Sequence, residues 1–367
     1  MKAVAVIGAA FGDEGKGLMT DYFCRQYSKP PIVVRYNGGA QAGHTVVTDK
    51  RRHVFSHIGS GYFTGADTFL SKFFLVNPAA FRIECSELGK YTEGRVYVHP
   101  NALVSTVYDS FINQELEKSR GDSRHGSCGM GINETIQRSK VAGFVLTASD
   151  LYAHDLIDKV VRVQNWARIR LQQCNLLNKE TEAWIRDPAI TRTFIDDCRS
   201  FADNVQYSSG MVLNGRNVVF EGAQGLLLDA NSYFFPHVTH SYTGLRNIVA
   251  IAEDLGIDEI DATYVMRTYL TRHGAGPLPG EDSNLNYLDT TNNKNAWQGS
   301  LRFARQDNEL MSKAIIKDLI IRKYTTVKIN PDIALTHVDQ EGFIPRIQDV
   351  LVRYNSDGPT ADHVGRL

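Results

Sequence analysis

The stretch "VAVIGAAFGDEGKG", residues 4–17, decides the fold expected for this chain. Its first four residues are apolar and predict a short buried strand, and the glycines that follow predict a tight loop leading into a helix. A strand, a glycine-rich loop and a helix N-terminus together form a cradle for phosphate, because the backbone N–H groups of the loop point at the anion. Lys16 adds a positive charge to that cradle.

The loop departs from the standard nucleotide-binding pattern G-x-x-x-x-G-K-[ST]. Six residues separate Gly8 from Gly15, and Gly17 stands where a Ser or Thr would hold magnesium. Asp13 and Glu14 place two carboxylates in an anion site. Asp13 can coordinate Mg²⁺, which prefers oxygen ligands, or accept a proton from a substrate bound beside the phosphates. Acidic residues in the first turn of a helix also interact favourably with the helix dipole, so a purely structural role is the alternative.

A second glycine-rich loop, "NGGAQAGHTV" at residues 37–46, follows the apolar run "PIVVRY" at residues 31–36. In an open α/β sheet, ligands collect at the C-terminal ends of the strands, so the second loop should open beside the first. His44 is a candidate acid there, and its small neighbours Ala42 and Gly43 permit a ligand to approach closely. A single histidine in a loop is also consistent with a structural role.

Alternating strand and helix patterns predict an α/β fold, built as a single large domain over residues 1–367 around a mainly parallel central sheet. The first loop is then P-loop-like. Residues at about 150–210 have helical spacing and few glycines, which predicts a helical insertion. Polar residues at about 282–300 predict a mobile surface loop. Further strands are expected at residues 73–78, 95–100, the beginning of 217–225, 325–330 and 332–339.

The composition is that of an ordinary soluble globular protein, with 43% hydrophobic and 22% charged residues. A net charge of −1 offers no basic surface for nucleic acid and no polybasic patch for a membrane. The apolar runs are too short to span a bilayer, and the N-terminal residues do not resemble a signal peptide. Five scattered cysteines without a C-x-x-C pair indicate a reducing compartment, no disulfide framework and no zinc site. We therefore expect a cytoplasmic protein.

The two loops together resemble those of the adenylosuccinate synthetase family, which read G-D-E-G-K-G and N-A-G-H-T. Five later stretches resemble further motifs of that family in the same order. They are "FEGAQGLLLD" (220–229), "PHVTHSYTG" (236–244), "TRHGAGPLPGED" (271–282), "ALTHVD" (334–339) and "SDGPTADHV" (356–364). The third of these resembles T-R-V-G-x-G-P-F-P-T-E and the fourth resembles T-K-L-D. The ordered set covers nearly the whole chain, which makes the resemblance specific.

The resemblance implies a ligase that joins L-aspartate to C6 of a 6-oxopurine nucleotide. Asp13 would remove the proton from purine N1, and O6 would attack the γ-phosphate of a nucleoside triphosphate. His44 would stabilise and protonate the leaving phosphate side, and Gln224 would hydrogen-bond the base or the phosphorylated O6. The amino group of aspartate would then displace phosphate from C6. Mg²⁺ would be held by Asp13 and the backbone carbonyl of Gly43, and a homodimer is expected because the family is dimeric.

The resemblance also implies which residues bind the nucleotides. These positions are Gly12, Glu14, Gly15, Lys16, Gly17, Asn37, Ala42, Gly43, Thr45, Ser127, Cys128, Arg138, Thr239, Asp339 and Gly358. Thr239 and Ser127 would hold the 5′-phosphate of the purine monophosphate. Arg138 would reach the nucleotide bound by a neighbouring subunit, and Asp339 would bind the guanine of a GTP donor.

The aspartate-binding residues are expected in "QGSLRFARQD", residues 298–307, which keeps fewer arginines than the aspartate loop of the family. Arg302, with Ser300 and Arg305, would bind the carboxylates of aspartate, a task that suits a guanidinium fork. Other positions also depart from the family pattern. Leu18 replaces the second lysine of G-K-G-K, and His337 replaces the lysine of T-K-L-D.

These departures resemble the short viral branch of the family. That branch joins aspartate to dGMP with ATP or dATP, giving N6-succino-2-amino-2′-deoxyadenylate on the way to 2-aminoadenine DNA, and a viral protein would act in the host cytoplasm. The alternative is the ordinary reaction of IMP, aspartate and GTP, which the retained Asp13 and Asp339 favour. A nucleotide-hydrolysing switch protein and a nucleotide kinase also stay open. A switch does not need the second site around Gln224, and no arginine-rich lid typical of a kinase is evident.

Overall fold

The computed structural model describes residues 1–89, 94–289 and 299–367. Within these residues a central sheet of ten strands has the order β14-β13-β12-β9-β1-β8-β2-β5-β6-β7. Neighbouring strands in this sheet run parallel, except for β13 with β14. The predicted α/β class, with one large domain around a mainly parallel sheet, is therefore confirmed.

The strands of the central sheet are β1 (Lys2–Gly8), β2 (Ile32–Arg35), β5 (Asp67–Leu70), β6 (Val96–Val98), β7 (Gln206–Tyr207), β8 (Val218–Glu221), β9 (Glu259–Arg267), β12 (Lys328–Thr336), β13 (Leu351–Ser356) and β14 (Val364–Arg366). Two small antiparallel pairs accompany it: β3 (His44–Val47) with β4 (Arg52–Phe55), and β10 (Tyr269–Arg272) with β11 (Arg302–Arg305). The helices are α1 (Lys16–Arg25), α2 (Pro78–Leu88), α3 (Val107–Ser119), α4 (Ile132–Ser139), α5 (Leu156–Gln173), α6 (Lys179–Arg186), α7 (Pro188–Asn204), α8 (Leu245–Leu255) and α9 (Asn308–Leu319).

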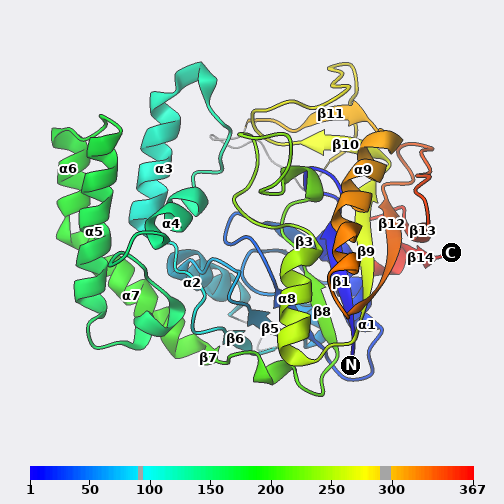
Figure 1. Cartoon of the computed structure of the whole chain (residues 1–367), viewed down its shortest axis with the longest axis horizontal. Helices are drawn as coiled ribbons and strands as arrows, with labels where there is room; N and C mark the ends of the chain where they lie inside the picture. Colours follow the sequence, from blue (N-terminus) through cyan, green and yellow to red (C-terminus); the bar gives the residue numbers. More distant parts are fainter. Residues whose placement is uncertain (90–93, 290–298) are drawn as a thin grey trace.

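Strand β1 is buried on both faces, which is typical of a central strand in a parallel sheet. Its Ile7 packs in a cluster with Ile248 of α8 and Ile315 of α9. Its Val6 points to the opposite face and packs with Met19 of α1. Helices α8 and α9 therefore cover one face of the sheet and α1 covers the other (Figure 1).

A second hydrophobic core lies beside the β5–β6–β7 edge of the sheet, where helices α2 to α7 gather on the left of Figure 1. Phe81 of α2, Tyr108 of α3, Trp166 of α5 and Phe201 of α7 are buried in it. Helices α5 to α7 occupy most of the segment expected to be a helical insertion. After them, β7 pairs with β6, so the chain returns to the sheet edge within that segment.

The strand predicted at residues 73–78 does not form. Asn77 accepts a hydrogen bond from the backbone N–H of Ala80, 3.0 Å away, and Pro78 is the first residue of α2. An Asn cap followed by proline is a strong helix start, because proline has the required φ and no N–H to leave unpaired. The strand of this region is β5, which ends earlier at Leu70.

The two late strands predicted on either side of Pro331 are one strand, β12. Proline normally interrupts a central strand because it cannot donate a hydrogen bond. Here β12 pairs with β9 along its whole length, including Pro331 opposite Ala262, but its pairing with β13 begins at Asp332. The proline thus sits where β12 is still an edge. Of the surface loop expected at about 282–300, residues 290–298 lie outside the described residues. No described helix is both long and apolar enough to cross a bilayer.

Candidate active site

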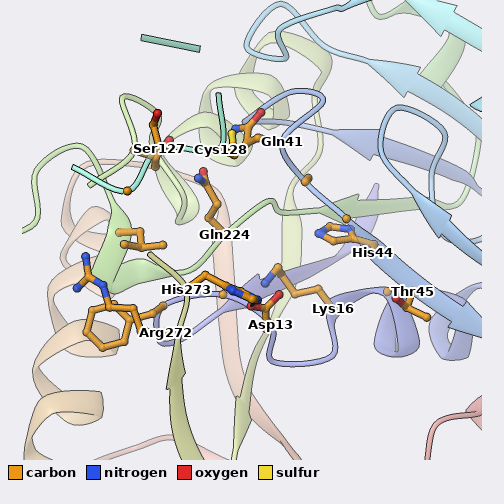
Figure 2. A pocket seen from close by; sticks show the side chains of 18 of the residues that line it. Asp13, Lys16, Gln41, His44, Thr45, Ser127, Cys128, Gln224, Arg272 and His273 are labelled. Carbon is orange, nitrogen blue, oxygen red and sulfur yellow. Dashed lines mark ion pairs between the residues drawn. The ribbon is translucent and has the colours of Figure 1, made fainter. Parts of the chain in front are cut away.

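A cavity of about 600 Å³ opens at the C-terminal ends of the central strands. The loops that follow β1, β2, β8, β10, β12 and β13 all contribute to its lining, together with residues 125–128. The two loops that the sequence placed at this edge do meet there. Asp13 comes from the loop after β1, Lys16 begins α1 at the end of that loop, and His44 begins β3 at the end of the loop after β2 (Figure 2).

The first loop turns sharply at Gly12 and Asp13, which have φ angles of 96° and 62°. A positive φ is strained for a residue other than glycine and persists only where the surroundings enforce it. The side chain of Arg267 does so here, because its Nε donates a hydrogen bond of 2.5 Å to the carbonyl oxygen of Asp13. The Asp13 carboxylate is thereby held at the cavity wall, ahead of the first turn of α1.

Glu14 was expected to bind nucleotide, but its side chain lies outside the described cavity lining. It is buried and accepts hydrogen bonds from the backbone N–H groups of Ala10 (3.0 Å) and Gly12 (2.8 Å). It also pairs with the ammonium group of Lys16 at 2.5 Å. Glu14 therefore shapes the loop from within and orients Lys16, which lines the cavity.

His44 is fixed by Glu221, the last residue of β8. Its Nδ1 lies 2.6 Å from Oε1 of Glu221, which is fully buried and also accepts hydrogen bonds from Ser60. Burial alone would raise the pKa of Glu221, but the charge of Arg35 and the contact with His44 hold it at about 2. An ionised carboxylate can only accept, so Nδ1 of His44 carries the proton and its Nε2 is the free ring nitrogen.

Burial lowers the pKa of His44, against the opposing effect of Glu221. The ring is therefore neutral at pH 7 in the ligand-free protein. Phosphate groups placed beside Nε2 would favour the protonated form, because an opposite charge stabilises an imidazolium. The His44–Glu221 pair is thus suited to gain a proton when an anionic substrate binds, and to donate it to a leaving phosphate.

The third loop, after β8, brings Gln224 to the cavity with a φ of 63°. Asn37 was expected to contact nucleotide but lies behind the described lining instead. Its amide exchanges two hydrogen bonds with the backbone of Ala223, at 3.0 Å and 2.8 Å. Asn37 therefore ties the second loop to the third and sets the position of Gln224.

Several buried polar atoms at the cavity wall have no hydrogen-bond partner in the described part of the chain. They belong to the side chains of Gln41, Gln224, Arg272 and His273. Buried polar groups are normally satisfied in folded proteins, so a group of unsatisfied ones around one cavity indicates a polar ligand. Figure 2 shows these side chains around the same space as Asp13 and His44.

Arg272 was not identified in the sequence, although the motif that contains it was. Its guanidinium donates to the carbonyl oxygens of Pro277 (2.8 Å) and His237 (2.7 Å) and lies 4.6 Å from the ring centre of Phe11. Burial and the charge of Arg302 lower its pKa to about 10. An arginine at the end of an apolar run and just before the glycine-rich stretch at residues 274–280 was the available signal in the sequence.

Other expected nucleotide-binding residues line the cavity. They are Gly12, Gly15, Lys16, Gly17, Ala42, Gly43, Thr45, Ser127, Cys128, Thr239, Asp339 and Gly358. Ser127 is held by Asn113, whose Nδ2 donates to Ser127 Oγ at 3.0 Å. The role of each of these residues in binding nucleotide stays a prediction.

Arg138 is placed differently from the expectation that it reaches a neighbouring subunit. It is fully buried, and its Nε and Nη2 each donate to the Asp109 carboxylate at 2.9 Å. Nη1 donates to the carbonyl oxygen of Phe144, and Nη2 also donates to the carbonyl oxygen of Val104. All three guanidinium nitrogens are thus used within the protomer, where the arginine joins α4 to α3.

The expected aspartate-binding residues Arg302, Ser300 and Arg305 also lie outside the described cavity lining. Arg302 is on β11, and its Nη2 donates to the carbonyl oxygens of Gly274 (2.8 Å) and Gly276 (2.7 Å). It also pairs with Glu281 at 2.6 Å. Arg302 therefore supports the turn after β10 in this structure, whereas Arg272 of the paired strand lines the cavity.

The expected Mg²⁺ ligands Asp13 and Gly43 both line the cavity. In the described residues no group of three or more His, Cys, Asp or Glu side chains could hold a metal ion. This donor set fits Mg²⁺ nonetheless, because that ion is commonly bound by one or two carboxylates and by substrate phosphates rather than by a protein cage.

A glycine-rich phosphate cradle, a histidine fixed by a buried carboxylate, and unpaired polar groups around one large cavity define a nucleotide-binding α/β enzyme. Comparison with known proteins identifies the enzyme family to which the chain belongs. The family model for adenylosuccinate synthetase matches residues 5–365. The chain therefore belongs to the adenylosuccinate synthetase family, which consists of ligases that form a C–N bond.

The relatives agree in sequence and in fold. Adenylosuccinate synthetase from Thermoplasma volcanium is 29% identical over 390 residues, covering 99% of this chain and 81% of the relative. The fully ligated enzyme from Plasmodium falciparum has a TM-score of 0.73 at 17% identity, covering 100% of this chain and 99% of that one. Succinoaminodeoxyadenylate synthetase of cyanophage S-2L, bound to dGMP and dATP, has a TM-score of 0.63 at 17% identity, covering 100% and 95%. At these identities the two structures support the fold.

Proposed function

We propose that this protein joins L-aspartate to C6 of a 6-oxopurine nucleotide through a 6-phosphoryl intermediate, at the expense of a nucleoside triphosphate. The observation that carries the proposal is the placement of Asp13 and His44, from two separate loops, in one cavity that also presents Lys16 and Gln224. A nucleotide-hydrolysing switch protein needs the phosphate cradle but not a second polar site beside it.

The side chains of this cavity suit each step. Asp13 takes the proton from N1, which makes O6 nucleophilic toward the γ-phosphate. Gln224 donates from its side-chain amide N–H to O6 of the purine, and its Oε1, which is buried without a partner in the described part of the chain, can accept a hydrogen bond from another ligand group. His44 donates from Nε2 to the departing phosphate, with Glu221 holding the ring. Lys16 and the loop N–H groups bind phosphate, and preorganised donors of this kind supply much of the rate in phosphoryl transfer.

Mg²⁺, held by Asp13, the carbonyl oxygen of Gly43 and the phosphates, would neutralise charge during the transfer. Aspartate needs cations for its two carboxylates. Arg272 is the guanidinium at the described cavity wall with a buried nitrogen that has no partner, and we assign aspartate to it in preference to Arg302. A homodimer is proposed from family membership.

For the substrates we propose dGMP as acceptor and ATP or dATP as phosphate donor. The support is the set of departures from the family pattern around the cavity. His337 stands where the family has lysine, and burial lowers its pKa to about 3, so a neutral ring replaces a cation beside the donor. A structural relative, the cyanophage S-2L enzyme, is bound to dGMP and dATP.

The alternative substrates are IMP and GTP. Asp339 favours them, because a carboxylate at the cavity wall can accept two hydrogen bonds from guanine and would be partly unpaired beside adenine. In this structure its Oδ2 accepts a hydrogen bond from the side-chain amide of Gln340, 2.9 Å away.

A panel of activity assays tests both the proposed ligase reaction and the proposed choice of substrates. Phosphate release and C–N bond formation are measured with IMP, GMP and dGMP, each crossed with ATP, dATP and GTP, in the presence and absence of aspartate. We expect product with dGMP, ATP or dATP, and aspartate together. Turnover with IMP and GTP but none with dGMP would show that IMP and GTP are the substrates. Phosphate release that does not depend on aspartate and the purine monophosphate would refute the proposed ligase reaction.

A further inference from the structure

Arg267 joins the proposed base to a second carboxylate, Asp289, which has no part in the reaction proposed above. Arg267 is the last residue of β9, and its side chain is only 4% exposed. Its Nε donates to the carbonyl oxygen of Asp13 at 2.5 Å, and its Nη2 donates to Oδ2 of Asp289 at 2.9 Å. Its Nη1 donates to the hydroxyl oxygen of Tyr269, also at 2.9 Å. All three guanidinium nitrogens therefore have a partner, and Asp289 is the ionisable carboxylate among those partners.

Asp289 is itself held close to Arg267. Its side chain is 6% exposed. Tyr287, two residues earlier, stacks on Tyr269 with ring centres 3.9 Å apart and ring planes 14° from parallel. The hydroxyl of Tyr287 donates to Oε1 of Glu341 at 2.7 Å. The ring of Tyr269 therefore supports the segment that carries Asp289, while its hydroxyl binds Arg267.

A buried guanidinium needs a negative partner, because an unpaired buried charge is costly. Burial acts to lower the pKa of Arg267, but the neighbouring Tyr269, Asp289 and Asp13 raise it. Of these three groups, Asp289 and Asp13 carry carboxylates. Without Asp289, the guanidinium would be attracted to the Asp13 carboxylate and would occupy the oxygen lone pairs that the base needs for the purine proton and for Mg²⁺.

We propose that Asp289 is a positioning residue for the base: by binding Nη2 of Arg267, it keeps that guanidinium on the backbone carbonyl of Asp13 and away from the Asp13 carboxylate. The same hydrogen bond holds Asp13 at its φ of 62°, which directs the carboxylate to the cavity wall. The inference rests on the proposed function and extends it to a residue outside the two reactive loops. Asp289 also lines the cavity, so direct binding of a substrate is the alternative that the experiments must separate.

The first experiment compares kcat with KM in Asp289→Ala and Asp289→Asn, using the acceptor and donor that the unaltered protein accepts. We expect kcat of aspartate-dependent phosphate release to fall by ~10- to 100-fold in Asp289→Ala, because a misplaced catalytic group can cost ~10²-fold. Asparagine keeps an oxygen that can accept from Nη2, so Asp289→Asn should lose less. A raised KM with unchanged kcat would show that Asp289 binds a substrate, and unchanged kinetics would show that it has no role; either result overturns the inference.

The second experiment asks whether Asp289 acts through Asp13. Residues that act as a unit have non-additive effects on kcat. In protein that already carries Asp13→Asn, we therefore expect Asp289→Ala to lower kcat by less than ~2-fold. A further loss as large as in the unaltered protein would contradict a role through the Asp13 carboxylate.

The third experiment does not require turnover. Hydrogen–deuterium exchange is measured at the backbone amides of residues 12–16 without substrates, starting with Gly12, whose N–H donates to Glu14 at 2.8 Å. In Asp289→Ala we expect exchange there to be ~10-fold faster, because the loop loses its fixed contact with Arg267. Unchanged exchange would overturn the positioning role. If the unaltered protein shows no aspartate-dependent turnover with any nucleotide pair, the proposed function fails, and this measurement still tests the contact.

Asp67→Ala is the matched control, because Asp67 also pairs with an arginine, Arg216 at 2.6 Å, but lies outside the described cavity lining. It should leave kcat and the exchange at residues 12–16 unchanged. Thermal unfolding checks that each variant is folded. If Asp289→Ala does not fold, Asp289→Asn is used in all three experiments with the same expected directions.

Discussion

At the scale of single residues, the site depends on side chains whose backbone is held in an uncommon conformation. Asp13, Gln224 and His337 have φ angles of 62°, 63° and 59°, and each lines the cavity after a different strand. Strained residues of this kind tend to gather at functional sites, because the surrounding fold must enforce them. The placement of a carboxylate, an amide and an imidazole around one cavity therefore depends on tertiary contacts such as Arg267 with Asp13.

Replacement of the proposed base should stop turnover without unfolding the protein. We expect Asp13→Asn to lower kcat by ~10²- to 10⁴-fold, as is usual when a general base is removed. Asparagine tolerates a positive φ, so the loop should keep its shape. Aspartate-dependent phosphate release measures the effect, with thermal unfolding as the control. A variant that keeps more than about a tenth of the activity would refute the role.

His337 should make the stability of the protein depend on pH. Burial keeps its folded pKa at about 3, whereas the unfolded value is near 6.5, so the unfolded chain binds more protons between these values. The free energy of unfolding should therefore fall as the pH drops below about 6.5. His337→Asn should remove about 2 kcal/mol of the loss between pH 7 and pH 4.5, measured by urea unfolding. An unchanged loss would show that other groups cause the acid sensitivity.

At the scale of elements, the reactive side chains come from loops that are joined to one another. Asn37 binds both backbone groups of Ala223 and so joins the loop of His44 to the loop of Gln224. Thr336 on β12 binds the carbonyl oxygen of Glu14 at 2.8 Å and joins the first loop to the strand beside β9. These side chains hydrogen-bond to the backbone of the loops and so fix the positions of the loops at the cavity.

Loss of the Asn37 tie should affect both stability and activity. Asn37→Ala leaves the buried N–H and C=O of Ala223 unpaired, and we expect a loss of ~2–4 kcal/mol in the free energy of unfolding. The value of kcat/KM should also fall, because the loop before His44 and the loop that carries Gln224 are no longer held in fixed positions relative to each other. Asn330→Ala is the control: Asn330 also makes two side-chain hydrogen bonds, to Glu259 and Asp261, but lies outside the described cavity lining. A normal kcat/KM for Asn37→Ala would contradict the coupling.

The elements also show what a single sequence can predict. Hydrophobic runs bounded by glycine identified β1, β2 and β8 because these strands are buried on both faces. Residues 73–78 were wrongly predicted as a strand, because an apolar run does not reveal that Asn77 and Pro78 begin a helix. Arg138 and Arg302 were expected at ligands, since their charge suits phosphate and carboxylate, but a motif does not show which internal carbonyls and carboxylates will take up a guanidinium.

At the scale of the whole molecule, the fold brings distant parts of the chain to one edge of the sheet. Residues near positions 13, 44, 224, 273 and 337 meet there, although positions 13 and 337 are 324 residues apart in the chain. The helices beyond β5 and β6 form a second core and add residues 125–128 to the cavity wall. The order of the motifs along the chain could be recognised from sequence, but their convergence needs the sheet order in which β1 lies between β8 and β9.

The residues with positive φ angles at the cavity, Asp13, Gln224 and His337, also limit how this enzyme can be re-engineered. A mutational library that introduces valine, isoleucine or threonine at position 13, 224 or 337 would mostly yield misfolded loops, since branched side chains clash at positive φ. Useful diversity should instead be placed at cavity residues with ordinary backbone, such as Leu18 and Gln41. Attempts to change nucleotide preference by copying whole loops from relatives would need to transfer Arg267 and Asn37 with them, because those side chains keep the loops in shape.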